Sequence, residues 1–258
     1  MPDTDPTNPG LIERPPELQE YYRDRTVVSR YLARRTSQPL NGFLHRRQVA
    51  FLNEVLRQRA PARVLEVAPG PARLTADLEF AGRGVAIDGS PEMLAVARTR
   101  LGPRRDTWLL VHGDAFALPV ANASVELAFG IRFVRRFQPE ARDRLYAELR
   151  RVLVPGGALI LDAQNRAVAG PHRQRKGVQS YAVFDQLYTR DELSAEIEGA
   201  GFQVRRIDGI LHHFPTQSRL NRLRRVGLAG LAGHLVRLVE QLPGGQPSTW
   251  MLLAERRP

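Results

Sequence analysis

The sequence predicts an α/β fold with a doubly wound, seven-stranded sheet that is mostly parallel, with its last strand antiparallel. From residue 63 onward, short apolar runs alternate with helical patterns, which is typical of parallel strands joined by right-handed crossovers. The runs are continuous and mostly apolar, as expected of strands buried on both faces. Two late strands, at 202–210 and 250–255, lack a βαβ crossover between them, so we expect them to pair antiparallel at the sheet edge.

The N-terminal part is expected to differ from this sheet. Residues 1–16 contain five prolines and no apolar core, which predicts a disordered tail. Residues 17–60 should form an N-terminal helical lid, with helices at 18–35 and 41–59. The sequence lacks an apolar run of about 18 residues, so we expect no membrane span and a cytoplasmic protein.

Residues 61–258 are expected to form the main domain. Its first five strands are the apolar runs at 64–67, 84–88, 108–111, 125–129 and 158–161. Helices are expected at 74–80, at 91–101, where Ser90 and Pro91 suit a helix start, and at 139–153. Near the end, a helix at 191–201 precedes the strand 202–210, and a helical insertion at about 217–243 follows it.

A turn of small residues after the first strand indicates a ligand site. The turn reads Glu66-Val67-Ala68-Pro69-Gly70-Pro71-Ala72, and such a turn lets backbone amides approach negative charge. The second strand ends at Asp88, 22 residues after Glu66, where a carboxylate can accept from both hydroxyls of a ribose. Together these features favour a nucleoside-containing cofactor, and the turn lacks the G-x-G-x-x-G pattern of dinucleotide sites.

Later segments indicate which cofactor this is. The third strand ends in Val111-His112-Gly113-Asp114-Ala115-Phe116-Ala117-Leu118-Pro119. The segment 124–129 follows, with the fourth apolar run, and the segment 149–157 precedes the fifth. This succession resembles the class I S-adenosylmethionine-dependent methyltransferases, especially the group similar to ubiquinone/menaquinone C-methyltransferases, over about residues 60–165. The resemblance implies S-adenosylmethionine as cofactor and a small-molecule acceptor that is methylated at oxygen or carbon. A membrane-facing role of the segment 219–242 would suit a lipophilic acceptor.

The resemblance also implies roles for individual residues. Glu66 resembles the acid that anchors the first loop and faces the methionine end of the cofactor. Asp88 should bind the ribose hydroxyls, and Asp114 should accept from the adenine amino group. The other cofactor-binding candidates are Ala68, Gly70 and Ala72 in the loop, Gly89 and Met93 near the adenine, Ala115 and Phe116 beside Asp114, Gly130 and Ile131 on the methyl-donor side, and Tyr22 and Tyr31 in the lid.

The loop departs from the family pattern at two positions. Ala68 and Ala72 stand where the family usually has glycine, and prolines flank Gly70. Because alanine adopts positive φ at a cost, we expect both alanines to have negative φ. The loop is therefore interpreted as a stiffened one that still binds through Gly70 and the helix N-terminus.

The resemblance implies a mechanism without a covalent enzyme intermediate, in which the protein aligns a nucleophile with the S–CH₃ bond and excludes water. It assigns no catalytic residue. His212 and His213 follow the sixth strand and either deprotonate the acceptor or serve in packing. Asp162 and Asn165 could ligate a cation but have no third ligand nearby, so no metal is expected.

Composition leaves alternatives open. The chain has 38 Lys+Arg against 27 Asp+Glu, a net charge of +11, and no cysteine, which excludes thiolate chemistry. This net positive charge either attracts phosphates or belongs to a solvated surface. Arg135 and Arg136 are expected to be solvated at the start of a helix. The net charge suggests RNA as an alternative, less favoured acceptor, whereas the alanine-substituted loop suggests a non-catalytic, methyltransferase-like scaffold.

The segment 219–242 is the most distinctive part of the chain. Its leucines recur at three- and four-residue steps, and arginines take the other faces. This pattern suits a substrate lid, a dimer helix or a peripheral contact with an anionic membrane, besides ordinary packing on the sheet. Both a monomer and a homodimer are compatible with it.

Overall fold

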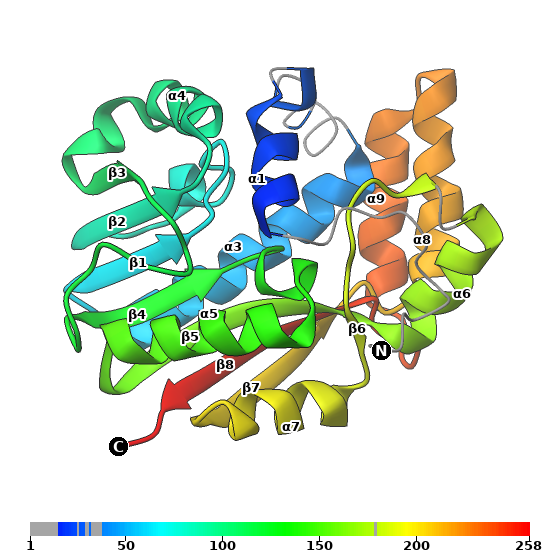
Figure 1. Cartoon of the computed structure of the whole chain (residues 1–258). Helices are drawn as coiled ribbons and strands as arrows, with labels where there is room; N and C mark the ends of the chain where they lie inside the picture. The colour runs from blue at the N-terminus through cyan, green and yellow to red at the C-terminus, as the bar shows by residue number, and fades with distance from the viewer. Residues whose placement is uncertain (1–14, 25, 29–30, 32–37, 178–179) are drawn as a thin grey trace.

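One mixed sheet forms the centre of the molecule (Figure 1). The computed structural model describes residues 15–24, 26–28, 31, 38–177 and 180–258. Within this part, seven strands follow the order β3-β2-β1-β4-β5-β8-β7, and the two-residue β6 pairs with β5. The strands are β1 (Arg63–Val67), β2 (Arg83–Asp88), β3 (Trp108–His112), β4 (Val125–Gly130), β5 (Leu153–Asn165), β6 (Leu187–Tyr188), β7 (Phe202–Ile210) and β8 (Thr249–Arg256).

Strand directions confirm the predicted mixed sheet. Strands β1 to β5 pair in parallel, and β8 pairs antiparallel with both β5 and β7. In the register of β1, Glu66 lies between Ala86 of β2 and Phe129 of β4. Strands β3 and β7 lie at the edges of the sheet. Strand β8 is inserted between β5 and β7 and buries its apolar run from Met251 to Ala254.

Helices cover both faces of the sheet. Alternate strand residues divide the core in two: Val64 and Phe129 belong to one apolar cluster, whereas Leu65 and Ala128 belong to the other. The first cluster includes residues of α3 (Pro39–Arg59), α4 (Pro91–Leu101) and α9 (Ala229–Glu240), and the second includes residues of α5 (Pro139–Val152) and α7 (Arg190–Gly199).

Two helix starts follow from local sequence. The hydroxyl of Ser90 accepts from the Met93 N–H at 3.1 Å, and Pro91 occupies the first turn of α4, as predicted. At α7 the Thr189 side chain accepts from the Glu192 N–H and the Glu192 side chain accepts from the Thr189 N–H, which forms a capping box.

The helix predicted at 74–80 is wrong. The structure has a single 3₁₀ turn, η1 (Thr75–Asp77), and the chain is extended again at Leu78. A side chain of α3 explains this ending, because Asn53 Oδ1 accepts the Glu79 N–H at 2.9 Å, a group that would otherwise donate within a helix.

The single helix predicted at 18–35 is also wrong. Helix α1 (Pro15–Arg23) ends before Asp24, whose carboxylate accepts from the Thr26 N–H at 2.7 Å and so begins a new turn. Most of the expected disordered tail, residues 1–14, lies outside the described part, and Pro15 already belongs to α1. Residues 32–37 of the predicted lid also lie outside it.

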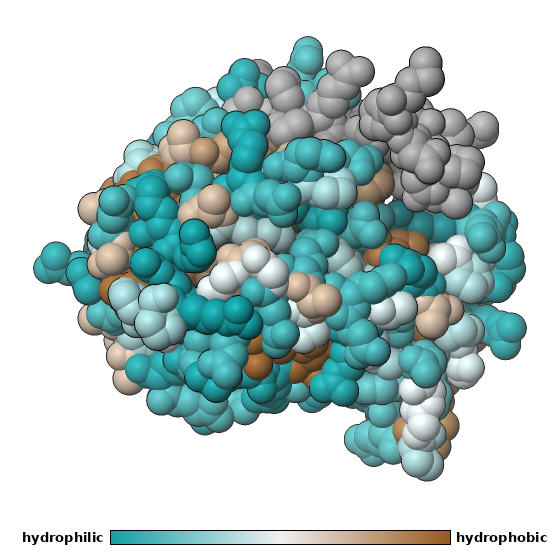
Figure 2. All heavy atoms as spheres, turned by 60° about the horizontal axis from the view of Figure 1, so that its bottom comes forward, coloured by the Kyte–Doolittle hydropathy of each residue, from teal (hydrophilic) through white to brown (hydrophobic). Residues whose placement is uncertain are grey.

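Three helical elements lie between β7 and β8: α8 (Phe214–Leu220), η5 (Asn221–Val226) and α9. They pack on the N-terminal part of the chain, since the Leu40 N–H at the start of α3 donates to Asn221 Oδ1 at 3.1 Å. Another helix, α6 (Arg166–Lys176), follows β5. Within the described residues, the helices lack the length and apolar character needed to cross a bilayer, and the face seen in Figure 2 is mostly hydrophilic.

Candidate active site

The loop after β1 has the backbone conformation of a glycine-rich turn. Ala68, Gly70 and Ala72 have φ values of 56°, 57° and 53°, so the predicted negative φ of both alanines is wrong. Hydrogen bonds to β2 impose this shape, because the Ala68 N–H donates to the Ile87 carbonyl and the Gly70 N–H donates to Asp88 Oδ2, both at 2.8 Å. Ala68 and Gly70 both have a backbone N–H, so the prolines at positions 69 and 71 remove neither of these hydrogen bonds.

Asp88 joins this loop to α4. Its Oδ2 accepts from Gly70 and its Oδ1 accepts from the Ser90 N–H at 2.9 Å. Burial raises the pKa of Asp88, whereas the two backbone donors favour its ionised form. Each carboxylate oxygen accepts one of these bonds and keeps a lone pair for one further donor. Asp88 can therefore accept from two adjacent hydroxyl groups.

A cleft of about 400 Å³ opens beside Asp88. Asp114 and Phe116 also line it, and Asp114 Oδ1 accepts the Phe116 N–H at 2.9 Å. The Phe116 ring packs edge-to-face against Phe137, with 5.1 to 5.3 Å between ring centroids along the row Phe116, Phe137 and Phe133. Eleven of the fourteen candidate cofactor residues line this cleft: Tyr22, Tyr31, Ala68, Gly70, Asp88, Gly89, Met93, Asp114, Ala115, Phe116 and Ile131.

The other three candidates, Glu66, Ala72 and Gly130, do not line the cleft. Glu66 is buried and accepts a hydrogen bond from the Thr75 hydroxyl, so it anchors the loop but does not line the cleft. Burial raises the pKa of Glu66 to about 8, although the Thr75 bond and the charge of Arg73 oppose the shift. Ala72 is fully buried, and Gly130 sits against the Val67 carbonyl.

Two tyrosines of the N-terminal part cover the cleft. The Tyr22 and Tyr31 rings pack edge-to-face with their centroids 6.3 Å apart, and both line the cleft. The Ser90 hydroxyl donates to the Tyr22 carbonyl at 2.9 Å, which ties α1 to the start of α4. The predicted lid residues therefore lie next to Asp88.

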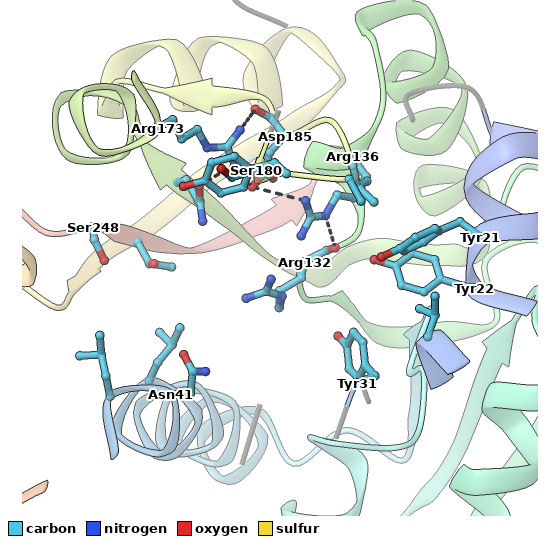
Figure 3. A pocket seen from close by; sticks show the side chains of 18 of the residues that line it. Tyr21, Tyr22, Tyr31, Asn41, Arg132, Arg136, Arg173, Ser180, Asp185 and Ser248 are labelled. Atoms are coloured by element: carbon cyan, nitrogen blue, oxygen red, sulfur yellow. Dashed lines mark hydrogen bonds and ion pairs between the residues drawn. The ribbon is translucent and has the colours of Figure 1, made fainter. Parts of the chain in front are cut away.

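A second cavity, of about 680 Å³, adjoins the cleft (Figure 3). The two spaces share Tyr22, Tyr31, Arg132 and Arg136 as lining residues. The second cavity extends from there between α3, α6, the segment 180–185 and the start of α8. The structure therefore places a second cavity beside the cleft that the candidate cofactor residues line.

Buried charges form the wall between α6 and the loop after β4. Asp185 accepts from Arg135 and Arg173 and lies 3.5 Å from a guanidinium nitrogen of Arg136. Burial disfavours the ionised form of Asp185, but the arginines outweigh it and lower its pKa. Arg135 is 3% exposed, so the expectation of a solvated helix start at Arg135 and Arg136 is wrong.

Sequence reasoning missed Arg132, Arg173 and Asp185. Arg132 follows β4 at the carboxyl edge of the parallel strands, where ligands of such sheets bind. Its position in the sequence was therefore sufficient to predict a residue of the ligand site. Asp185 follows no strand or motif and lies 50 residues from Arg135, so its role could not be read from the sequence.

The candidate base and cation residues are engaged elsewhere. His212 Nδ1 lies 3.1 Å from Glu240 Oε1, and His213 Nε2 lies 3.1 Å from the Leu242 carbonyl oxygen. Among the described residues, those lining the two cavities include neither histidine. Asp162 accepts from the Arg132 N–H, and Asn165 caps α6 by accepting from the Ala167 N–H at 3.0 Å.

A family model described as a methyltransferase domain matches residues 64–157, which include the loop, Asp88 and Asp114. This segment is a class I, S-adenosylmethionine-dependent methyltransferase domain. The domain's residues fit that cofactor, since Asp88 has two acceptor positions for the ribose hydroxyls and the row of phenylalanines offers an apolar wall.

Similar proteins carry the same kind of domain. The chain is 33% identical to a malonyl-[acyl-carrier protein] O-methyltransferase of Methylococcus capsulatus over 57% of this chain and 54% of that protein. It is 37% identical to a demethylmenaquinone methyltransferase of Deinococcus radiodurans over 40% of this chain and 43% of that protein. The chain thus spans about half the length of the curated relatives it matches.

A solved structure shares the fold of this methyltransferase domain. The magnesium protoporphyrin IX methyltransferase of Synechocystis PCC 6803, with bound SAH, aligns with a TM-score of 0.66 and 12% identity. The alignment covers 93% of this chain and 98% of that one, so the similarity of fold extends beyond residues 64–157.

Proposed function

We propose that this protein is an S-adenosylmethionine-dependent methyltransferase that methylates oxygen or carbon of a small molecule. The observation that carries the proposal is the pair of adjoining cavities, one lined by the candidate cofactor residues and the other open beside it. The names of the relatives support both kinds of target atom, since one is an O-methyltransferase and others are ubiquinone/menaquinone C-methyltransferases.

The protein's task in this reaction is alignment. The cofactor supplies an electrophilic methyl group on a sulfonium. Asp88 would accept from the ribose hydroxyls and Asp114 from the adenine amine, and the Gly70 N–H fixes the position of Asp88. Tyr22 and Tyr31 line both cavities, so they would exclude water from the cofactor and help to position the acceptor.

The cavities also bear on the two alternatives. The second cavity holds about 680 Å³, within the range of small-molecule sites, which supports a small acceptor rather than RNA. The cleft at Asp88 is open rather than filled by neighbouring side chains, which supports cofactor binding rather than a scaffold role.

Calorimetry with S-adenosylhomocysteine tests the proposal. Asp88→Ala removes two charge-assisted acceptors of hydroxyl donors, so we expect affinity to fall by about 100-fold or more. Asp106→Ala, at an exposed position of the 3₁₀ turn η2 (Gly102–Asp106), is the matched control and should bind normally. Unchanged affinity in Asp88→Ala would refute this cofactor site, and no binding to the native chain would favour the scaffold.

We also propose that residues 219–242 make a peripheral contact with an anionic membrane, which would suit a lipophilic acceptor. Large apolar side chains are exposed there, at Val226, Leu228, Leu231 and Leu238, close to Arg222, Arg224 and Arg225. Co-sedimentation with anionic vesicles tests this contact. A concentration-dependent dimer without vesicle binding would assign the same face to a second copy of the chain.

A further inference from the structure

The second cavity carries more positive than negative charge. Arg132, Arg136 and Arg173 line it, and Asp185 is the sole carboxylate among the described lining residues. Resting on the proposed function, we propose that the methyl acceptor is a small molecule with an oxyanion group, a carboxylate or a phosphate, which Arg132 and Arg173 bind.

Two buried carboxylates pair with part of this charge. Asp185 pairs with Arg135, Arg136 and Arg173, and Asp162 lies 3.5 Å from a guanidinium nitrogen of Arg135. Three guanidinium groups therefore share two carboxylates in this cluster. The charge of Arg132 also helps to lower the pKa of Asp185. Away from bulk water such an excess is poorly screened, so an anion that enters the cavity gains from it.

Burial lowers the pKa of Arg173, and the neighbouring charges of Arg135 and Arg136 lower it further, although Asp185 opposes the shift. An anion beside this guanidinium would favour its charged form.

Arg173 is also oriented for recognition. Its guanidinium donates to Asp185 and to Gln164 Oε1, the latter at 3.0 Å, and lies 4.9 Å from the centroid of the Tyr181 ring. Its Nη2 donates both hydrogens to these two partners, so the Nε–H and one Nη1–H remain as donors for an anion. In Figure 3, Arg132 points into the open space above Asn41 and Tyr31. The two arginines thus face the same space from different elements.

Arg135 and Arg136 have structural roles instead. Arg135 is buried between the two carboxylates. Arg136 donates to the Phe184 carbonyl at 3.2 Å and to the Arg132 carbonyl at 3.4 Å. Both side chains hold the segment around residue 184 against the loop after β4, which leaves anion recognition to Arg132 and Arg173.

The remaining wall suits an apolar body on the acceptor. Leu40, Leu44 and Phe214 line one side of the cavity, and Tyr22 and Tyr31 line the end shared with the cofactor cleft. An acceptor anchored at Arg173 would therefore lay its apolar part toward the two tyrosines. Its reacting oxygen or carbon would lie at that end, away from the anionic group.

Matched probes test the proposal on the full chain saturated with S-adenosylhomocysteine. The probes are benzoate, phenyl phosphate, benzyl alcohol and benzylamine, and the measurement is dissociation constants by ligand-observed NMR. We expect at least one anionic probe to bind about tenfold or more tightly than the alcohol, because hydrogen bonds between a guanidinium and an anion are stronger than those to a neutral hydroxyl. The amine should bind more weakly than the alcohol, and the two anions separate carboxylate from phosphate recognition.

Variants locate the site. Arg173→Gln and Arg132→Gln should each reduce the preference for the anion about tenfold, and Arg173→Lys should retain part of it because it keeps the charge but loses the planar fork. Arg237→Gln on α9, outside the described lining of the cavity, is the control and should behave as the native chain.

Two results would overturn the inference. One is benzyl alcohol binding as tightly as both anions, and the other is full retention of the anion preference in both glutamine variants. Because S-adenosylhomocysteine binding is measured first, its absence would count against the proposed function itself. Its presence without anion preference would count against this inference alone.

Discussion

At the scale of single residues, the loop after β1 has a left-handed backbone that two alanines adopt at a cost. Ala68 and Ala72 have the same positive φ as Gly70, although the left-handed region costs an alanine about 1–2 kcal/mol. The bonds from Ala68 to Ile87 and from Gly70 to Asp88 fix this conformation. The loop therefore has the backbone conformation of a glycine-rich turn, although alanine occupies two of the three positions.

This cost predicts that Ala68→Gly stabilises the protein. Glycine relieves the strain of the left-handed backbone. It also raises the conformational entropy of the unfolded chain, which costs about 0.4–1 kcal/mol of stability. We therefore expect the free energy of unfolding to rise by roughly 0.5–1 kcal/mol. Ala72→Gly should gain less, because it also removes a fully buried methyl group. Urea unfolding followed by circular dichroism measures both free energies.

Ala95→Gly is the matched control for that experiment. Ala95 is exposed in the middle of α4, where the same substitution should destabilise by about 1 kcal/mol. Opposite signs at positions 68 and 95 would establish backbone strain as the cause. A loss of stability in Ala68→Gly as large as that in Ala95→Gly would contradict it.

At the scale of elements, a single carboxylate joins α5, β6 and α7. Glu196 of α7 accepts from Arg142 at 2.9 and 2.7 Å, from the Tyr146 hydroxyl at 2.6 Å and from the Tyr188 hydroxyl at 2.9 Å. Burial raises the pKa of Tyr188 well above its usual value, so its hydroxyl stays a donor. These bonds hold the helices of one face together beside the charged wall of the second cavity.

We expect Glu196→Gln to destabilise the protein by about 2–4 kcal/mol. The amide keeps the shape but removes the negative charge, which leaves the buried Arg142 guanidinium without its counterion. Thermal and urea unfolding measure the loss. Glu198→Gln, exposed on the same helix, should stay within about 0.5 kcal/mol of the native chain. Equal stability of the two variants would show that the hydrogen bonds of Glu196 contribute little to the free energy of unfolding.

At the scale of the whole molecule, the sequence predicted the parts that depend on local pattern. The apolar runs predicted the strands and their direction, and the strand ends predicted that Asp88 and Asp114 line one cleft. It did not predict pairings between distant segments, such as Asp185 with Arg135. The net charge of +11 also gave no indication that several arginines are buried against carboxylates, because a composition does not record burial.

The buried Glu66 gives the unfolding free energy of the whole molecule a pH dependence that can be measured. Its pKa is about 8 in the folded protein and near 4.5 in the unfolded chain, so the folded state holds more protons between these values. The stability due to this proton is fully present below pH 4.5 and is lost as the pH rises through 8. Glu66→Gln removes the titration, so its free energy of unfolding should rise relative to the native chain by a few kcal/mol between pH 5 and pH 9. Glu148→Gln is the control: its hydrogen bond with Arg151 lowers the pKa of Glu148, so its difference from the native chain should stay constant over that range. A Glu66→Gln difference that is equally constant would mean that Glu66 is ionised in the folded protein.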